Sequence, residues 1–577
     1  MRINKVKIKN YRNLDGIDLV LNQDVNFIVG ENDLGKSNFL DLLDKVFNSK
    51  FKEEDFDNKD EDINIDFSLV LDDNELGAFN DYFNPEDGNE INMNAQMGIS
   101  DDYISYYHIE SGDHIKKDQI KCANFIKYSS LRNPADELTF YRNRGVGKLL
   151  NFMIKSSYEK ESSDEHSNIV NIEYIEKFVE KINDNFSKIR IFEEFGIETS
   201  VEEDPIDLIS RILRIKDSKD IHITKIGHGV QFSVLIILSI LEKLMNIIET
   251  RTLEKCIFES EGDKSISLIL GLDEPEIHLH PYRQRNVIKY IKNLLNSEEE
   301  GFKSLIKEIL GIDYINGQAI VVTHSPNILT DNYKQITRFY QKEGNINVKS
   351  GSNFNLDKQL HKTLLKYIPY VKESFFSKCT VIVEGDSECG ALPIFAKKDE
   401  LDLDKSGISI IQSGGFGSMI PLAKLLKHFD ISNVGIMDLQ EFNGNEQKIK
   451  DNKLNIYSTA YKDFEDEIYR SFRIEDYIKF IGDYFPNNIH FFNDEAKKLG
   501  KTIDFTIPNV YKQLESFSKI EKYTLKKNLE KNELIFLGKN KSIIMGIDLA
   551  NSVSKIPDPY LNLLKKAKRL SDEQNKA

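Results

Sequence analysis

The fold of the N-terminal half follows from the segment DVNFIVGENDLGKSNFLDLLDKVF, residues 24–47. A short apolar run ends at Gly30, and from about Lys36 onward the apolar residues recur at the spacing of one buried helix face. Between them, GENDLGKS has the spacing of a P-loop, which is a glycine, four residues and then Gly-Lys-Ser. A strand, a glycine loop and a helix in this order predict a phosphate-binding turn in an α/β domain.

The residues of this loop suit the parts of a nucleotide. The two glycines let backbone N–H groups surround a phosphate, the lysine can reach the β and γ phosphates, and the serine can ligate magnesium. A chance glycine turn is the alternative, but the strand before the loop and the helix after it argue against one. The predicted nucleotide-binding residues here are Gly30, Asn32, Gly35, Lys36, Ser37 and Asn38.

Two later strands predict the rest of an ATP site. SISLILGLDEPEIHLHP, residues 265–281, brings Asp273 to the end of an apolar run, where it would hold magnesium. Glu274 would orient or deprotonate the attacking water. AIVVTHSPNIL, residues 319–329, ends at His324, a candidate γ-phosphate sensor or simply a turn cap. His278 and His280 could share a cation, but no third ligand stands at metal-site spacing, so a loop explains them better.

KIGHGVQFS, residues 225–233, leads into a long apolar helix. Gly229 and Gln231 at its start suit a second phosphate clamp at a helix N-terminus, with an ordinary glycine loop as the alternative. Together with IKNYRNL, the P-loop and the two acidic or histidine strand ends, this order of motifs resembles the ABC-type ATPase head of the SMC and RecF group. The resemblance implies that ATP binds between two copies, with Gly229 and Gln231 serving the partner's nucleotide, and hence a homodimer or higher homo-oligomer. No Leu-Ser-Gly-Gly stretch is present.

Acidic residues gather again in the C-terminal half. TVIVEGDSECGALP, residues 380–393, places Glu384, Asp386 and Glu388 after an apolar strand. ISNVGIMDLQEF, residues 431–442, delivers Asp438 at a second strand end, and IYSTAYKDFEDEIYRSF, residues 456–472, is acidic at a helix start. The carboxyl ends of parallel strands share one edge, so these acids can converge. Converging carboxylates need cations, and two Mg²⁺ or Mn²⁺ ions would suit phosphodiester cleavage.

This second half resembles the TOPRIM domain of the overcoming lysogenization defect (OLD) nucleases, which include the nuclease subunit of the Gabija phage-defence system. VEGDSE, DFEDEIY and GKNKSIIMGIDLA carry the resemblance. It implies that Lys541 stabilises the charge of the scissile phosphate. The implied metal ligands are Glu384, Glu388, Asp438, Asp463 and Glu465.

One position departs from the family pattern. TOPRIM strands usually end Asp-x-Asp, whereas the run here is Asp438-Leu439-Gln440. Gln440 offers a neutral oxygen and removes one negative charge, which lowers the expected affinity for one ion. Glu441 could replace that charge, although in an extended strand end it would face the other way.

Length and composition bound the organisation. A chain of 577 residues is too long to form one compact core, so we expect more than one domain. The polar stretch 342–359 is the best candidate for the boundary between an N-terminal and a C-terminal half. The fold class expected is α/β: an ABC-type head over 1–355, with a helical insertion at about 150–220 that we expect to dimerise, then a Rossmann-like TOPRIM domain with C-terminal helices over 375–577. No signal peptide or membrane span is apparent, so we expect a cytoplasmic protein with no membrane partner. Four scattered cysteines predict reduced thiols.

The motifs and the resemblance together predict an ATP-regulated, Mg²⁺- or Mn²⁺-dependent DNA endonuclease that acts on DNA in anti-phage defence. They leave open a helicase-like protein as a further partner. The net charge of −17 opposes DNA binding unless bound metal reverses the local sign. The main alternative is a nucleotide-sensing ATPase scaffold whose weakened TOPRIM domain recruits or triggers another protein. A primase or topoisomerase shares the acidic fold, but zinc-ligand cysteines are lacking, and a minimal type I topoisomerase has no ATPase head.

Overall fold

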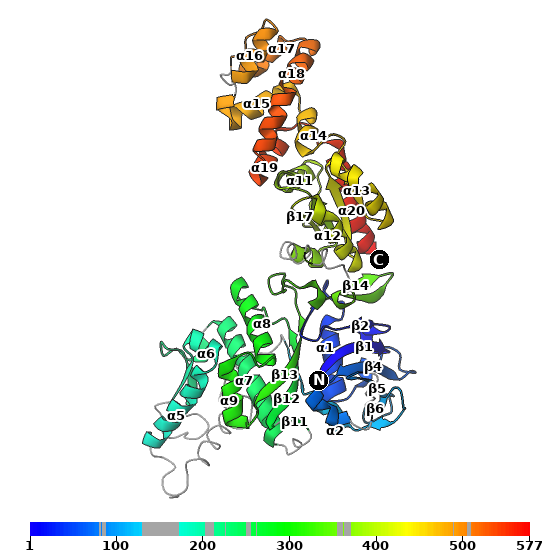
Figure 1. Cartoon of the computed structure of the whole chain (residues 1–577), viewed down its shortest axis with the longest axis vertical. Coiled ribbons are helices and arrows are strands. Elements are labelled where there is room, and N and C mark those ends of the chain that lie inside the picture. The colour runs from blue at the N-terminus through cyan, green and yellow to red at the C-terminus, as the bar shows by residue number, and fades with distance from the viewer. Residues whose placement is uncertain are drawn as a thin grey trace, which may run out of the picture. The chain divides into compact units, whose positions relative to one another are not determined.

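The computed structural model describes residues 1–79, 82, 88–129, 172–201, 213–225, 227–249, 256–260, 262–277, 279–354, 362, 371–488, 490–504 and 509–576 (Figure 1). Its contacts divide the chain into two compact units. The N-terminal unit comprises Met1–Tyr340 with Asn345–Asn353, and the C-terminal unit comprises Gln341–Gly344 with Phe354–Ala577. The last crossing between the units, from Asn353 to Phe354, falls within the polar stretch 342–359, and the first crossing, from Tyr340 to Gln341, lies just before it. None of the four cysteines forms a disulfide, which agrees with the predicted reduced thiols.

The N-terminal unit is built on a mostly parallel sheet in the order β11-β12-β13-β3-β14-β15, with β8 beside β12. β3, β13, β12 and β8 run parallel, and β3 is buried along its whole length, as expected for a strand covered on both faces. The strands are β3 (Val25–Val29), β8 (Phe125–Tyr128), β11 (Ile257–Ser260), β12 (Asp263–Asp273), β13 (Tyr314–Val322), β14 (Ile336–Lys342) and β15 (Asn345–Ser350).

A second, antiparallel sheet in the order β2-β1-β4-β5-β6-β7 completes this unit. β5 alternates buried and half-buried residues, the pattern of a strand with one face on the core. That core contains residues of both sheets and the apolar face of α1 (Lys36–Asn48). It therefore fixes the helix that follows the phosphate loop. The strands are β1 (Arg2–Lys9), β2 (Asp18–Val20), β4 (Ile63–Val70), β5 (Glu90–Met97), β6 (Ser105–His108) and β7 (His114–Ile115); α2 (Lys117–Lys121) follows them.

Helices α7 (His228–Glu249), α8 (Pro281–Leu295) and α9 (Glu300–Leu310) lie beside β12 and β13 (Figure 1). α7 is long and apolar enough to cross a membrane by composition, but 76% of its apolar window is buried in the protein, as in a core helix. The expected helical insertion is only partly helical. Its described part holds α5 (Ile172–Ser187), α6 (Arg190–Phe195) and a hairpin of β9 (Glu198–Val201) with β10 (Leu213–Lys216), and residues 150–171 and 202–212 lie outside the described part.

The C-terminal unit has a four-stranded parallel sheet in the order β17-β16-β18-β19. Strands and helices alternate along the chain, which confirms the predicted Rossmann-like α/β class. The strands are β16 (Cys379–Val383), β17 (Ile408–Gln412), β18 (Ser432–Met437) and β19 (Ile456–Ser458). The helices around them are α11 (Asp386–Lys398), α12 (Phe416–His428), α13 (Leu439–Asp451) and α20 (Asp558–Lys576), of which α12 and α20 contact β16 and β18.

A helical lobe is inserted between β19 and α20 (Figure 1). Its helices are α14 (Phe464–Ser471), α15 (Ile474–Tyr484), α16 (His490–Lys498), α17 (Asn509–Glu515), α18 (Lys519–Lys539) and α19 (Ile543–Ser552). α19 returns to cross α11 at close range, since a Cβ on Gly546 would lie 1.9 Å from the Ser387 carbonyl oxygen. Only glycine allows this approach, which brings the loop before α19 to the ends of the sheet strands.

Candidate functional site

The phosphate loop connects β3 to α1, as predicted. Gly30 adopts a φ of 147°, and a Cβ there would lie 2.2 Å from the Phe339 carbonyl oxygen, so the loop runs directly against β14. Lys36 lies back over the loop: its Nζ donates to the Gly30 carbonyl at 3.1 Å and also to the Glu31 carbonyl. Burial lowers the pKa of Lys36 to about 8, against the opposing charge of nearby acids.

The strand end at Asp273 meets the start of α1. The Ser37 hydroxyl donates to Asp273 Oδ1 at 2.9 Å, although the two residues are 236 positions apart. Burial raises the pKa of Asp273, and the bond from Ser37 opposes that rise. A hydroxyl and a carboxylate in contact beside a phosphate loop are the protein groups that hold a nucleotide's magnesium in P-loop proteins.

Glu274 and His324 face each other at the same edge of the sheet. Glu274 has a φ of 49°, the left-handed region, and its Oε1 lies 3.7 Å from His324 Nε2. Burial, and then the charge of Lys36, lower the pKa of His324, which favours its neutral form. The predicted water-orienting acid and phosphate sensor are therefore adjacent.

Glu276 is a residue that the sequence reading missed. It is only 9% exposed, and its Oε1 accepts bonds from the Thr323 hydroxyl at 2.6 Å and the His324 amide at 2.8 Å. Its Oε2 has no hydrogen-bond partner among the described residues, and burial raises its pKa. Glu276 thus ties the loop after β12 to the end of β13. In the sequence, the only sign of this role is that Glu276 is an acid two places after the Asp273-Glu274 pair.

The remaining predicted nucleotide ligands lie in different surroundings. Asn32 is exposed in the loop, whereas the Asn38 side chain accepts a bond from Arg12 at 2.7 Å and donates to Asn13 at 2.8 Å. Gly229 lies in the first turn of α7, as expected. Gln231 is 1% exposed, so its side chain is buried in its own unit and is not presented at the surface to a partner's nucleotide.

The histidine pair differs from a metal site. The His280 ring is tilted against the Tyr282 ring, with ring centroids 5.1 Å apart, and His278 lies outside the described residues. Over the described parts of the chain, no group of three or more His, Cys, Asp or Glu residues is arranged with the spacing of a bound metal ion.

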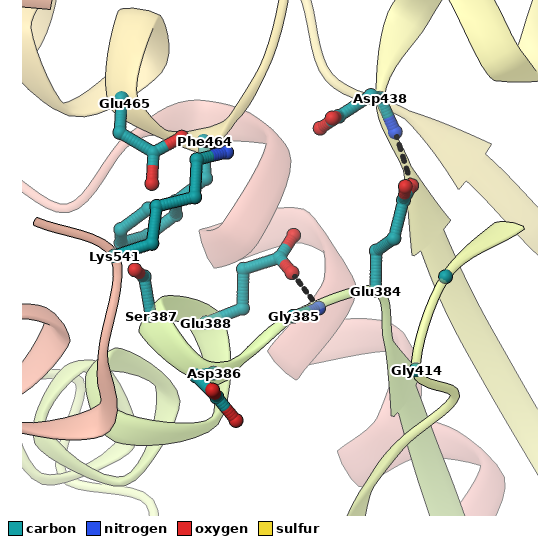
Figure 2. Close-up of a pocket in the computed structure, with 11 residues that line it drawn as sticks. Glu384, Gly385, Asp386, Ser387, Glu388, Gly414, Asp438, Phe464, Glu465 and Lys541 are labelled. Atoms are coloured by element: carbon teal, nitrogen blue, oxygen red, sulfur yellow. Dashed lines mark hydrogen bonds and ion pairs between the residues drawn. The ribbon is translucent and has the colours of Figure 1, made fainter. Parts of the chain in front are cut away.

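The acids of the C-terminal unit converge on one cavity of about 230 Å³. Figure 2 shows the side chains of Glu388, Asp438, Glu465 and Lys541 pointing into it, from α11, the end of β18, α14 and the loop before α19. The lining residues are Glu384, Gly385, Asp386, Ser387, Glu388, Gly414, Gly415, Asp438, Phe464, Glu465 and Lys541. Four of the five predicted metal ligands and the predicted lysine therefore come together.

Three carboxylates of the cavity are held by protein donors. Glu384, directly after β16, accepts a bond from the Asp438 backbone amide at 3.4 Å. Glu388 is buried in the first turn of α11 and accepts a bond from the Gly385 amide at 2.7 Å. Glu465 pairs with Lys541 Nζ at 2.7 Å, across 76 residues of intervening helices.

Burial and mutual repulsion raise the pKa values of the acids in the cavity. Burial, and then the neighbouring Asp438 carboxylate, raise the pKa of Glu388 to about 8 against the bond from Gly385. Burial, then Glu384 and Asp463, raise the pKa of Asp438 to about 7. Burial also raises the pKa of Glu384 and Glu465. Buried carboxylates that repel one another are hard oxygen donors, the ligand chemistry that a divalent cation such as Mg²⁺ or Mn²⁺ takes, although among the described residues they do not lie at the spacing of ligands around a bound ion.

Asp463 is placed differently from the prediction. It does not line the cavity but caps α14, where its side chain accepts a bond from the Asp466 amide at 3.1 Å. Asp466 pairs with Arg470 at 2.7 Å, and Glu467 accepts the Tyr461 amide at 2.7 Å. Successive helical positions point in different directions, so only one acid of this run enters the cavity.

The segment after Asp438 also differs from the prediction. β18 ends at Met437 and α13 begins at Leu439, so Gln440 and Glu441 lie in the first turn of a helix and not in an extended strand end. Glu441 therefore lies one helical turn from Asp438, on the same side. Its charge contributes to the raised pKa of Glu384, after burial, whereas Gln440 is exposed.

Comparisons with known proteins match both halves of the chain to domain families. Residues 1–190 and 148–329 match the AAA ATPase domain, and residues 375–439 match the TOPRIM domain of overcoming lysogenization defect protein-like proteins. No match was found among curated proteins.

Three solved structures illustrate the similarity. An Smc head bound to the C-winged helix domain of ScpA is 16% identical, with a TM-score of 0.38, over 62% of this chain and 99% of the other. RecF with ATP is 15% identical, with a TM-score of 0.32, over 60% and 97%. The C-terminal region of the Burkholderia pseudomallei OLD protein is 16% identical, with a TM-score of 0.20, over 34% and 99%.

Proposed function

The chain belongs to the AAA ATPase family and carries an OLD-like TOPRIM domain, and from this premise we propose that it is an ATP-regulated, divalent-metal-dependent DNA endonuclease. The observation that carries the proposal is the convergence of Glu384, Glu388, Asp438, Glu465 and Lys541 on one cavity. Glu384, Glu388, Asp438 and Glu465 would hold the metal. Bound Mg²⁺ or Mn²⁺ would stabilise the charge on the attacking and leaving oxygens of a phosphodiester.

The chain's own residues divide the remaining work. Lys541 is 49% exposed at the cavity and carries a positive charge that a phosphate oxygen can reach. In the other unit, Lys36 would bind the terminal phosphates and Glu274 would orient water towards them, with His324 adjacent. ATP binding would then regulate DNA cleavage.

The biological setting forms part of the same proposal. We infer a homodimer or higher oligomer that cuts DNA in anti-phage defence in the cytoplasm, with a helicase-like protein as a partner. The support is the family membership and the order of motifs in the ATPase domain.

Gln440 favours a second candidate function. It is exposed in the first turn of α13 and supplies no charge where the family pattern has an acid. A nucleotide-sensing scaffold with a weakened TOPRIM domain would fit this substitution. Glu441, on the same side of the helix as Asp438, argues for the nuclease because it restores a negative charge near Glu384.

A plasmid assay separates the two functions. Supercoiled plasmid is incubated with the full-length protein and Mg²⁺ or Mn²⁺, with and without ATP. The nuclease predicts nicked or linear product that is lost in Glu384→Ala and in Asp438→Ala but retained in Asp404→Ala, an exposed acid outside the cavity. Intact plasmid with every metal, with and without ATP, would refute the nuclease and support the scaffold.

A further inference from the structure

We infer that Tyr560, on the C-terminal helix α20, is a positioning residue of the acidic cavity: its hydroxyl holds the Glu388 carboxylate in place for metal binding. The inference rests on the proposed metal-dependent function. Tyr560 lies outside the lining of the cavity and 172 residues from Glu388, so it would act only through that carboxylate.

The contact is buried and specific. Tyr560 is 0% exposed, and its hydroxyl donates to Glu388 Oε1 at 3.1 Å. The other carboxylate oxygen, Oε2, accepts the Gly385 amide at 2.7 Å. Each oxygen of Glu388 therefore has one protein donor, which fixes the rotation of the carboxylate, and each keeps a lone pair for a further ligand. Without the tyrosine hydroxyl, only the amide would orient this group.

The tyrosine ring is itself fixed by aromatic neighbours. Phe464 meets it edge to face, with ring centroids 5.4 Å apart, and the Phe395 ring lies 6.1 Å away. Phe464 also lines the cavity and directly precedes Glu465. The ring is thus held by α11 and α14, the two helices that supply Glu388 and Glu465, and small rotations of the hydroxyl away from Glu388 are sterically opposed.

A hydrogen bond of this kind alters metal binding in a predictable way. Groups that hydrogen-bond to a metal-ligating side chain orient it, and their loss typically reduces metal affinity by about 10-fold to 100-fold. Tyr560→Phe removes one oxygen and leaves the ring packing unchanged. We therefore expect Tyr560→Phe to bind Mn²⁺ about 10-fold more weakly than the wild type.

The chain offers a matched control. Tyr477 is also 0% exposed, in the same unit, and its hydroxyl donates to Glu533 Oε2 at 2.7 Å, away from the cavity. Tyr477→Phe makes the same chemical deletion from a buried Tyr–Glu pair. It controls for any general loss of stability that follows from removing a buried hydroxyl.

The experiment titrates Mn²⁺ into full-length wild type, Tyr560→Phe and Tyr477→Phe by isothermal calorimetry, without ATP or DNA, and records each melting temperature. The metal concentration for half-maximal plasmid nicking is measured in parallel. Weaker Mn²⁺ binding and a higher half-maximal concentration in Tyr560→Phe alone, with an unchanged rate at saturating metal, support the inference. Equal affinity in Tyr560→Phe and wild type, or an equal loss in Tyr477→Phe, overturns it and leaves the nuclease proposal standing. A wild type that binds no Mn²⁺ overturns both.

Discussion

Replacing Asp438 with asparagine should stabilise the metal-free protein at alkaline pH. The reason is the charge of the cavity: burial and the neighbouring Glu384 and Asp463 raise the pKa of Asp438 from 3.8 to about 7. A carboxyl whose pKa is higher in the folded state destabilises the fold as the pH rises. The penalty is absent below the ordinary pKa near 4, grows between pH 4 and pH 7, and is complete above about pH 7.

The magnitude follows from the same shift. A rise of about 3 pKa units corresponds to about 4 kcal/mol of folding free energy. Asp438 is only partly buried, so solvent screening reduces the expected effect, and we take about 2 kcal/mol as the gain from Asp438→Asn at pH 8. For a unit of this size that gain raises the melting temperature by roughly 4–8 °C.

Differential scanning calorimetry of the full-length protein in EDTA measures the effect at pH 4 and pH 8. Asp438→Asn should melt at the wild-type temperature at pH 4 and several degrees higher at pH 8, and Asp404→Asn should match the wild type at both. Adding Mg²⁺ at pH 8 should raise the melting temperature of the wild type more than that of Asp438→Asn, because the metal binds the folded state only where its ligands remain. No stabilisation at pH 8, or an equal gain at pH 4, would refute this account of the cavity.

Three further predictions concern the ATPase unit. Lys36→Ala should weaken ATP binding by about 10-fold to 100-fold, because a charge-assisted bond to phosphate is lost; titration with a fluorescent ATP analogue checks this, and unchanged affinity would contradict the site. Glu276→Ala should lower the free energy of unfolding by about 1–3 kcal/mol, because the Thr323 hydroxyl and the His324 amide lose their acceptor, and it should slow phosphate release from ATP with little change in ATP affinity. Glu276→Gln keeps an oxygen at this place and should recover part of both losses. Gly30→Ala should lower the melting temperature because its Cβ would lie 2.2 Å from a backbone oxygen, whereas Gly77→Ala, with no atom within 4 Å, should not; equal melting temperatures would contradict the close approach at the loop.

Local patterns were enough for the parts of the fold that depend on neighbouring residues. The P-loop between a buried strand and a helix could be predicted because its glycines, its lysine and the apolar periodicity all lie within about 20 residues of one another. The ends of β12, β13, β16 and β18 were predicted for the same reason. Parallel pairing then placed the residues that follow β12 and β13 at one edge of the N-terminal sheet, and those that follow β16 and β18 at one edge of the C-terminal sheet.

Predictions failed where a side chain's partner decides its direction. Asp463 and Glu465 differ by two positions in one acidic run, yet the first caps a helix and the second enters the cavity. Gln231 begins a helix after a glycine loop, but the packing of α7 buries it. Gln440 and Glu441 were read as strand, because the point at which β18 gives way to α13 carries no glycine or proline to mark it.

The sequence by itself determined that this chain has a phosphate loop, acidic residues at the ends of β12, β16 and β18, and two α/β units, because these features are written in residues close together along the chain. Only the tertiary structure decided which acids share a cavity, that Glu276 holds His324, and that Tyr560 from the last helix reaches Glu388. Those contacts join residues that lie 48 and 172 positions apart, and their geometry depends on how helices cross, which no local pattern specifies.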